Sequence, residues 1–420
     1  MKVYVESYGC AANQGDTSIM EGVLLERGHI IVDNVDDADA VLINTCTVID
    51  TTQQRMMNRI RNLRKSGKPL VVAGCMASAQ EEVVKRIAPD ALLLSPRRAH
   101  SIADVLEGKR VHTRSPKVGV PRKAGLHLSV PIADGCSYRC SYCITKRARG
   151  NLTSYPLEGL ANDIADAIGR GSREIRLTAQ DTASYGRDSG CTLGELLEKI
   201  SLIEGDFRVR VGMMHPRSAH EILDELLEAY RHEKIYKFLH LPLQSASPRI
   251  LKAMRRGYDI ETFMEVVEAF RNRFPRLMFA TDIIVAFPGE REEDFLASVE
   301  AVKELQPDVV NITRFSPRPH TDAWHMKRMP THIAKERSRI LSRVADEIAL
   351  EKNRGYIGIT TGALVLGTYN GFSVGKTDSY KSVFVKGVQP GVFATVRVVD
   401  AAPTHLHAIY LNDDDFTYHD

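Results

Sequence analysis

Apolar runs alternate with amphipathic stretches over the first quarter of the chain. Three runs of apolar residues predict short buried strands: 3–7, 40–44 and 69–74. Between the first two, apolar residues recur at helical spacing over 16–27, and Gly28 provides a stop signal. Because strand, helix and strand alternate, the pattern predicts a parallel α/β domain over residues 1–111.

The middle of the chain continues this alternation with longer helical stretches. Six apolar runs predict further strands: 128–132, 174–178, 208–213, 236–241, 277–287 and 308–315. Helical patterns come after them, for example at 157–169, 193–203, 218–230 and 292–305. Six such units predict a partial (β/α)6 barrel over 127–355, smaller than the closed eight-unit form. A long charged helix is expected at 331–354.

The last segment, 356–420, changes to short strands with period-two alternation and frequent glycine. The pair Asn370-Gly371 marks a hairpin turn, so a small five-stranded β-barrel is predicted. Such barrels often bind RNA. Four Lys and Arg face six Asp in this segment, which makes a weak case for RNA from its sequence alone. A polar, proline-containing stretch at 112–126 is interpreted as the linker before the central barrel.

Composition narrows the class of protein. A chain of 420 residues exceeds one hydrophobic core, so about three domains are expected. The net charge of +3 allows an RNA partner through local basic patches. Lys2 and Glu6 interrupt any N-terminal export signal, and no apolar run is long enough for a membrane span. The sequence therefore predicts a soluble, cytoplasmic protein with no membrane partner.

Seven cysteines in a chain without an export signal favour metal or redox chemistry over disulfides. Cys10, Cys46 and Cys75 each come soon after a predicted strand. Because the carboxyl ends of parallel strands share one edge of a sheet, these thiols are expected to converge there. The alternative is three buried cysteines that act as small apolar residues.

A second group of cysteines, Cys136, Cys140 and Cys143, has the spacing CxxxCxxC directly after the first barrel strand. Thiolate is a soft ligand that suits iron–sulfur clusters and zinc. In a [4Fe–4S] cluster three cysteines leave one iron open to a non-protein ligand. A structural zinc site needs a fourth ligand, and no His or Cys lies close after Cys143.

The CxxxCxxC loop resembles that of the radical S-adenosylmethionine (SAM) enzymes, and the whole chain resembles the methylthiotransferase family. The motifs that carry the second resemblance are SYGCAAN, NTCTV, AGCMASAQ, HLPLQSAS and TDIIVAFPGE. It implies an N-terminal Rossmann/flavodoxin-like domain, a radical SAM barrel and an OB-like, RNA-binding TRAM β-barrel. It also implies two [4Fe–4S] clusters, one on Cys136, Cys140 and Cys143, and an auxiliary one on Cys10, Cys46 and Cys75. Cys191 is left over as a partly exposed thiol.

The stretch TKRARGNLTSYP (145–156) resembles the branch of the family that acts on threonylcarbamoyladenosine in tRNA. That resemblance implies conversion of N6-threonylcarbamoyladenosine at position 37, on the 3′ side of the anticodon, to its 2-methylthio derivative. It implies that SAM is used twice, once for methyl transfer and once for the 5′-deoxyadenosyl radical. An external one-electron donor and a sulfur source are then required. Two rivals are methylthiolation of a ribosomal-protein aspartate and a non-catalytic, zinc-stabilised RNA-binding protein.

Basic residues provide candidate contacts to RNA phosphates. No acidic residue occurs from Thr51 to Gln80, and the run contributes Arg55, Arg59 and Lys65 as candidates. The second group follows the CxxxCxxC loop and consists of Lys146, Arg147 and Arg149. The alternative for such a run is a solvated helix face.

For SAM, the family resemblance indicates Tyr142, Gln180 and Asp181; the alternative for the last two is that they cap the following turn. No catalytic residue beyond the cluster ligands is predicted, because radical chemistry needs no acid–base pair at the target carbon. Two positions depart from the family pattern: Ala286 and His320 stand where glycine is usual. Both put the local backbone shape in doubt.

Overall fold

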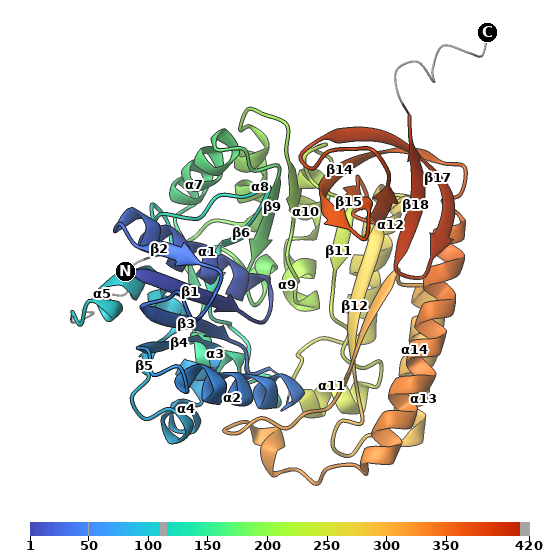
Figure 1. Ribbon diagram of the computed structural model, residues 1–420. Coiled ribbons are helices and arrows are strands. Elements are labelled where there is room, and N and C mark those ends of the chain that lie inside the picture. Colours follow the sequence, from blue (N-terminus) through green and yellow to red (C-terminus); the bar gives the residue numbers. More distant parts are fainter. Residues whose placement is uncertain (49, 110–115, 412–420) are drawn as a thin grey trace. The chain divides into compact units, whose positions relative to one another are not determined.

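The computed structural model describes residues 1–48, 50–109 and 116–411 (Figure 1). The start of the predicted linker at 112–126 and residues 412–420 lie outside this range. The chain forms two compact parts. The first part contains residues 1–205 and 316–326, and the second contains 206–315 and 327–420. These parts divide the predicted central segment, since its first two strands belong with the N-terminal sheet.

The first part contains a five-stranded parallel sheet of order β2-β1-β3-β4-β5. Its strands are β1 (Lys2–Ser7), β2 (Ile30–Val32), β3 (Ala40–Thr45), β4 (Leu70–Gly74) and β5 (Leu92–Leu94). This is the flavodoxin-like order, as expected. The central strands β3 and β4 are buried on both faces, which explains their continuous apolar sequences.

Helices cover this sheet: α1 (Ala11–Glu26), α2 (Asp50–Arg64), α3 (Cys75–Ala79), α4 (Glu81–Ile87), η1 (Pro96–Ser101) and α5 (Ile102–Leu106). The apolar side of α1, including Ile19, Met20 and Leu24, packs into the core beside Val3 and Leu42. Helix α1 begins five residues before the predicted start, directly after Cys10. Its first turns are polar yet buried, so hydrophobic periodicity could not reveal them.

The same part contains the start of the central segment. Strand β6 (His127–Pro131) pairs in parallel with β9 (Glu174–Thr178). The other elements are β7 (Ala133–Asp134), α6 (Thr145–Arg149), β8 (Thr153–Ser154), α7 (Leu157–Gly169), η2 (Thr182–Ser184), α8 (Leu193–Ser201) and η3 (Asp322–His325). Helix α1 packs on β6, and α3 packs on α6. A Cβ atom at Gly15 would lie 2.7 Å from Pro131, so glycine permits the first of these contacts.

The second part contains β10 (Arg208–Arg210) and the parallel sheet β11 (Phe238–His240), β12 (Met278–Val285) and β13 (Val309–Arg314). Its helices are α9 (Pro216–Glu221), α10 (Leu223–Ala229), α11 (Pro248–Met254), α12 (Ile260–Arg273), α13 (Glu292–Leu305) and α14 (Thr331–Arg354). Figure 1 shows α13 and α14 as long helices beside the sheet. All six strands predicted for the central segment are present. The helix predicted at 218–230 is instead two, because Ile222 has non-helical backbone angles between α9 and α10.

The C-terminal strands close into a barrel of order β14-β15-β16-β18-β17, as predicted. They are β14 (Thr360–Tyr369), β15 (Phe372–Thr377), β16 (Ser382–Val385), β17 (Phe393–Ala402) and β18 (His405–Tyr410). Asn370 and Gly371 both have positive φ, as a tight hairpin turn requires. Asp308 ties this barrel to α14, since it accepts from Lys381 at 2.7 Å and from Lys352 at 2.6 Å. No helix of the described residues is long and apolar enough to cross a membrane.

The two positions that lack the usual glycine keep a glycine-like backbone. Ala286 has φ 60° and His320 has φ 63°, both in the left-handed region. A left-handed conformation costs an L-residue about 1–2 kcal/mol, because its Cβ approaches the following carbonyl oxygen. The turn at Ala286 is held by its amide, which donates to Glu290 Oε2 at 2.7 Å. The chain therefore tolerates strain at these sites and retains the local shape.

We expect Ala286→Gly to raise the free energy of unfolding by up to about 1 kcal/mol. Relief of about 1–2 kcal/mol of strain outweighs the entropy that glycine adds to the unfolded chain, about 0.4–1 kcal/mol. A matched control is Ala280→Gly, also buried but in the extended strand β12, which should lower stability by about 1 kcal/mol. Urea titrations of both variants check the prediction, and equal losses at the two sites would contradict it.

Candidate functional site

The first three cysteines lie at one edge of the parallel sheet. Cys10 follows β1 at the start of α1, Cys46 follows β3, and Cys75 begins α3 after β4. Burial raises the pKa of the Cys75 thiol to about 12, and the nearby Cys10 and Cys46 add to the rise. The pKa of Cys46 is raised by burial and by Cys10. The three thiols are thus close enough to influence one another's ionisation.

A glycine with positive φ precedes three of the six candidate ligands. These glycines are Gly9, Gly74 and Gly135, which come directly before Cys10, Cys75 and Cys136. A Cβ atom at Gly135 would lie 2.0 Å from the carbonyl oxygen of Asn151, and one at Gly74 would lie 2.3 Å from Asn44. Glycine therefore allows a sharp turn at the strand end, which directs the following thiol away from the sheet.

The CxxxCxxC loop begins two residues after β7. The amide of Cys136 donates to the carbonyl oxygen of Gly150 at 3.1 Å, which closes the loop onto the end of α6. Cys136 and Cys140 are partly buried, whereas Cys143 is exposed. Burial raises the pKa of Cys136 to about 12, and the charges of Asp181, Cys143 and Cys140 raise it further. The three thiols of this loop are therefore close enough for Cys140 and Cys143 to affect the ionisation of Cys136.

The two cysteine groups are adjacent. Cys75 and Ala79 of α3 pack in one apolar cluster with Ile144 and Ala148, the residues that follow Cys143 along the chain. This contact lies within the first compact part. The two cysteine groups therefore meet where α3 packs against the CxxxCxxC loop and α6.

Four charged side chains with 0–1% exposure lie beneath these loops, and we call them the buried ion cluster: Asp16, Lys117, Asp134 and Arg149. Arg149 is 2.6 Å from both Asp16 and Asp134. Lys117 is 2.5 Å from Asp16 and 2.7 Å from Asp134. Two positive and two negative charges thus alternate in a closed ring, so each buried charge is compensated.

The buried ion cluster connects both cysteine loops. Asp134 lies two residues before Cys136, and Asp16 lies on the helix that follows Cys10. Arg149 also donates to Asn13 Oδ1 at 2.9 Å, and the Cys75 thiol lies 3.7 Å from the same oxygen. Burial opposes ionisation of Asp134, but the charges of Lys117 and Arg149 outweigh it and hold its pKa below the ordinary range.

The structure corrects one predicted RNA contact, Arg149, and places a second, Arg59, in an ion pair. Arg149 is 1% exposed and fully occupied by Asp16, Asp134 and Asn13, so its side chain cannot reach a phosphate. Arg59 of α2 forms an ion pair with Glu6, and its Nε donates to both carboxylate oxygens at 2.8–2.9 Å. A partly buried carboxylate thus matches the charge of Arg59, and contact of this side chain with RNA stays a prediction.

The other predicted RNA contacts remain accessible. Arg55 is exposed on α2, Lys65 is exposed directly after that helix, and Arg147 is exposed on α6. Lys146 is partly buried, and its Nζ donates to the carbonyl oxygen of Ser137 at 3.3 Å. These four side chains stay candidates.

Arg147 opens onto a pocket of about 480 Å³ that the sequence did not reveal. Arg97 and Arg98 of η1, Ser78 of α3 and Ser95 line it as well, and none of the described lining residues is Asp or Glu. Arg97 is held in place by Thr153 Oγ1 at 3.2 Å and by the carbonyl oxygens of Arg149 and Asn151. We call this the arginine pocket. Its chemistry suits an anion such as a phosphate.

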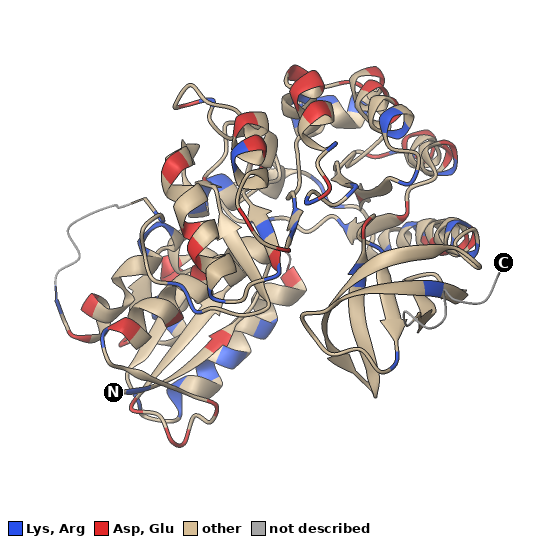
Figure 2. Ribbon diagram, turned by 90° about the horizontal axis from the view of Figure 1, so that it is seen from above, with Lys and Arg blue, Asp and Glu red and all other residues tan. Residues whose placement is uncertain are grey.

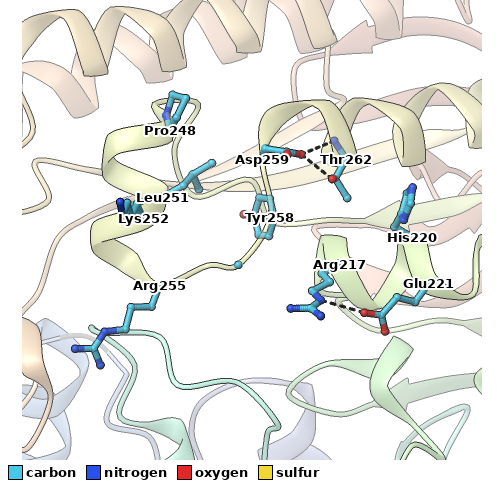
Figure 3. A pocket seen from close by; sticks show the side chains of 11 residues that line it. Arg217, His220, Glu221, Pro248, Leu251, Lys252, Arg255, Tyr258, Asp259 and Thr262 are labelled. Carbon is cyan, nitrogen blue, oxygen red and sulfur yellow. Dashed lines mark hydrogen bonds and ion pairs between the residues drawn. The ribbon is translucent and has the colours of Figure 1, made fainter.

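A larger pocket, of about 740 Å³, lies in the second part between α9, α11 and α12 (Figure 3). Its charges are of both signs: Arg217 donates to Glu221 at 3.0 Å, and Asp259 caps α12 by accepting from Thr262. Figure 3 shows both pairs within the pocket wall. Internal pairing makes this pocket a poorer match for phosphate than the arginine pocket.

The predicted SAM contacts lie near the CxxxCxxC loop. Gln180 Oε1 accepts from the amide of Gly135 at 2.7 Å, so it holds the turn before Cys136. Asp181 accepts from the Ser184 hydroxyl, which is the turn-capping alternative considered for it. Its charge nevertheless acts on Cys136. Tyr142 lies between Cys140 and Cys143 along the chain, and its side chain is partly buried. Contact of these three with SAM stays a prediction.

The sequence did not reveal that a buried arginine, Arg318, holds the residues that follow Cys46. Arg318 is 3% exposed and donates to Gln53 Oε1 at 2.6 Å and to the carbonyl oxygen of Thr47 at 3.3 Å. It also lies 3.3 Å from Asp50. Arg318 is 271 positions from Thr47, the residue after Cys46, so only the fold places the two side by side.

The donor set fits iron–sulfur clusters. No three His, Cys, Asp or Glu side chains within the described ranges are grouped as ligands of a single metal ion would be. Ligands of a [4Fe–4S] cluster bind different irons, so they need to surround a volume and not one point. The candidate ligands are thiols only, in two adjacent groups. Burial raises the pKa of Cys75 and of Cys136, and a bound metal would overcome this by replacing the proton.

Three family models match the chain. Residues 2–95 match the uncharacterized protein family UPF0004, residues 130–302 match the radical SAM superfamily, and residues 356–411 match the TRAM domain. One match falls within each of the three predicted segments.

Curated relatives share one name. The chain is 42% identical over 413 residues to the probable threonylcarbamoyladenosine tRNA methylthiotransferase of Methanocaldococcus jannaschii, covering 96% of this chain and 95% of that protein. It is 41% identical to the protein of that name in Pyrococcus horikoshii, covering 97% and 98%. The human threonylcarbamoyladenosine tRNA methylthiotransferase is 35% identical over 82% of this chain and 62% of its own length.

Solved structures share the fold. The radical SAM methyltransferase TsrM from Kitasatospora setae, with cobalamin and a [4Fe–4S] cluster bound, matches with a TM-score of 0.56 at 15% identity, over 89% of this chain and 80% of that one. The cobalamin-dependent SAM radical enzyme OxsB matches with a TM-score of 0.53 at 10% identity, over 84% and 56%.

Proposed function

This chain belongs to the family of threonylcarbamoyladenosine tRNA methylthiotransferases, and from that premise we propose that it replaces the C2 hydrogen of N6-threonylcarbamoyladenosine in tRNA with a methylthio group. The target is the adenosine that follows the anticodon, position 37. One structural observation supports this most strongly: the two cysteine groups meet where Cys75 of α3 packs beside Ile144, and Arg149 connects them. A reaction that inserts sulfur at a radical centre needs both groups within reach of one nucleoside.

When bound, two [4Fe–4S] clusters and SAM supply the one-electron, methyl-transfer and sulfur chemistry that protein side chains cannot provide. Cys136, Cys140 and Cys143 would hold one cluster, and Cys10, Cys46 and Cys75 would hold the other. An external one-electron donor and a sulfur source complete the reaction. The chain itself contributes position and exclusion of water, since the groups that connect the loops are buried.

Each connecting residue has a defined role in this proposal. The buried ion cluster fixes the CxxxCxxC loop relative to α1, so the two cysteine groups keep one spacing. Gln180 holds the Gly135 turn, and its neighbour Asp181 faces Cys136, where the amino group of SAM would arrive. Tyr142 would contact the SAM adenine through its main chain. No side chain is required to move a proton at the adenine C2.

Substrate tRNA would contact the first part through its basic residues. The arginine pocket begins three residues after Cys75 and four after Cys143, so it adjoins both cysteine loops. A backbone phosphate near the target nucleoside matches its size and charge. Arg55 on α2, Lys65 directly after that helix and Lys146 would extend this contact.

We expect Arg147→Glu to weaken tRNA binding by about 5- to 20-fold, because a phosphate contact is replaced by repulsion. The salt dependence of binding should also become shallower by about one unit in the log–log slope. The matched control is Arg339→Glu, the same charge change on the exposed side of α14. Binding isotherms at several salt concentrations measure both quantities. If the two variants bind tRNA alike, the arginine pocket is not a substrate contact.

The reaction can be tested with purified protein. Anaerobically reconstituted protein is incubated with SAM, sulfide, dithionite and tRNA that carries threonylcarbamoyladenosine, and the digested nucleosides are analysed by mass spectrometry. We expect the 2-methylthio nucleoside to appear with wild-type protein and to be absent with Cys140→Ala. A colourless protein that binds zinc and leaves this tRNA unchanged would overturn the proposal.

A further inference from the structure

The chain contains a single tryptophan, Trp324, and its side chain is 39% exposed. Trp324 lies in η3, a short 3-10 helix within the first compact part. Tryptophan side chains are large and are highly buried on average. In this turn the residue that packs inside is Ala323, which is fully buried, whereas Trp324 presents part of its indole to solvent. An exposed indole of this kind is typical of a binding surface.

A backbone hydrogen bond fastens η3 to the CxxxCxxC loop. The amide of Ala323 donates at 2.9 Å to the carbonyl oxygen of Ser141, a residue inside that loop. Ser141 is itself buried, so this contact is shielded from water. The turn is closed by the amide of Trp324, which donates to the carbonyl oxygen of Thr321 at 3.1 Å. The backbone of Trp324 is thus held in a fixed place beside the loop.

The start of the same segment is fastened to the Cys46 loop. The hydroxyl of Thr321 donates to the carbonyl oxygen of Arg318 at 2.7 Å. The guanidinium of Arg318 in turn donates to the carbonyl oxygen of Thr47, directly after Cys46, at 3.3 Å. The segment therefore extends from one cysteine group to the other, and Trp324 is anchored to both.

The surroundings of Trp324 favour a nucleic acid over a protein partner. Its neighbours in η3, Asp322 and His325, are exposed and polar, so the indole does not continue along the chain into an apolar patch. Arg139, exposed and two positions before Ser141, offers a positive charge on the CxxxCxxC loop. Figure 2 shows further Lys and Arg on helices of the first part, for example on α2. This part thus offers cations for an RNA backbone and an aromatic ring for a base.

We propose that the indole of Trp324 stacks on the adenine of the target nucleoside in tRNA. The inference rests on the proposed function and assigns a contact to its substrate base. Unpaired bases of RNA are recognised by stacking on aromatic side chains, and enzymes that modify a base take it out of the stack. The C2 hydrogen and the N6 substituent both lie at the edge of the adenine ring. A side chain that covers the face of the ring leaves these edges open toward the cysteine groups.

The two anchors of Trp324 determine what this contact contributes. Because the segment is fastened to both cysteine loops, a base stacked on the indole keeps one position relative to both groups. A reaction that uses the two groups in turn on one carbon atom requires such a fixed position, since small displacements of the reacting atoms cost rate steeply.

Binding of tRNA by the reconstituted full-length protein tests this inference in a double-variant cycle. The tRNA is assembled with either adenosine or an abasic nucleotide at position 37. We expect Trp324→Ala to bind the adenosine form about tenfold more weakly than the wild type, at an unchanged salt slope, because stacking involves no ion pair. The abasic nucleotide should cost the wild type a similar factor and cost Trp324→Ala nothing further. Trp324→Phe should stay within about threefold of the wild type, because it keeps an aromatic ring.

Leu202→Ala is the matched control, since Leu202 is an exposed apolar residue of the same compact part. The iron content and thermal midpoint of Trp324→Ala should equal those of this control. In turnover, Trp324→Ala should raise the KM for tRNA. It should also raise the amount of 5′-deoxyadenosine formed per modified nucleoside, because the radical then forms beside a poorly placed base.

The outcomes are distinguishable. An equal penalty from the abasic nucleotide in the wild type and in Trp324→Ala would overturn the inference, and the proposed function would stand. Coupling of Trp324 to a neighbouring base and not to position 37 would overturn it as well. So would loss of iron in Trp324→Ala with unaltered tRNA affinity, which would show a role in the fold. If the wild type binds tRNA that carries threonylcarbamoyladenosine but does not methylthiolate it, the proposed function has failed.

Discussion

Replacing Arg149 by alanine is expected to lower the free energy of unfolding of the first compact part by about 3–5 kcal/mol. The change removes one of two cations from the buried ion cluster and leaves Asp16 and Asp134 with Lys117 alone. No water can replace the guanidinium at 1% exposure without opening the packed interior. Because Arg149 also holds Asn13 beside Cys75, we expect iron content to fall with stability.

The matched control for this change is Arg147→Ala, two residues earlier on α6 and exposed. It should change stability by less than about 0.5 kcal/mol. Hydrogen exchange of α1 and α6 amides reports the opening energy of this part, and iron analysis reports cluster content. A stable Arg149→Ala protein with full iron but weak tRNA binding would show that Arg149 acts on the substrate after all.

The second large effect is expected when the two cysteine groups are removed one at a time. Alanine at Cys136, Cys140 and Cys143 should abolish reductive cleavage of SAM and all product. Alanine at Cys10, Cys46 and Cys75 should retain formation of 5′-deoxyadenosine but abolish methylthiolation. In each triple variant, reconstituted iron should fall from about eight to about four per chain, since one [4Fe–4S] cluster is lost.

Cys191→Ala is the control for the triple variants. Its thiol lies apart from both groups, in contact with Ser189 at 3.4 Å, and the variant should keep full iron and activity. Iron and sulfide analysis, 5′-deoxyadenosine and modified nucleoside are measured on the same preparations. Wild-type iron and product in the variant lacking Cys10, Cys46 and Cys75 would exclude a second cluster there.

Local patterns were sufficient to predict most elements. The strand predicted at 174–178 and the helices at 157–169, 292–305 and 331–354 have the bounds seen in the structure. Continuous apolar runs and clear helical periodicity determine these elements. Two three-residue strands, β2 and β5, were not predicted, because so short a run carries no period.

Long-range partners were beyond the sequence. The TKRARG stretch has three basic residues within five positions. Nothing in this sequence distinguishes the buried Arg149 from the exposed Arg147. The difference arises from Asp16, which lies 133 positions away along the chain. The contact of Phe384 with His407 was hidden for a related reason, since only the pairing of β16 with β18 places the two rings together.

The central claim is that this chain methylthiolates threonylcarbamoyladenosine in tRNA. The most direct measurement is mass spectrometry of nucleosides from total tRNA of source cells with and without the gene, and with the gene restored. The account predicts that 2-methylthio-threonylcarbamoyladenosine disappears without the gene, that its unthiolated parent rises, and that restoration reverses both. An unchanged tRNA nucleoside profile, together with loss of a methylthio group from a ribosomal protein, would contradict it.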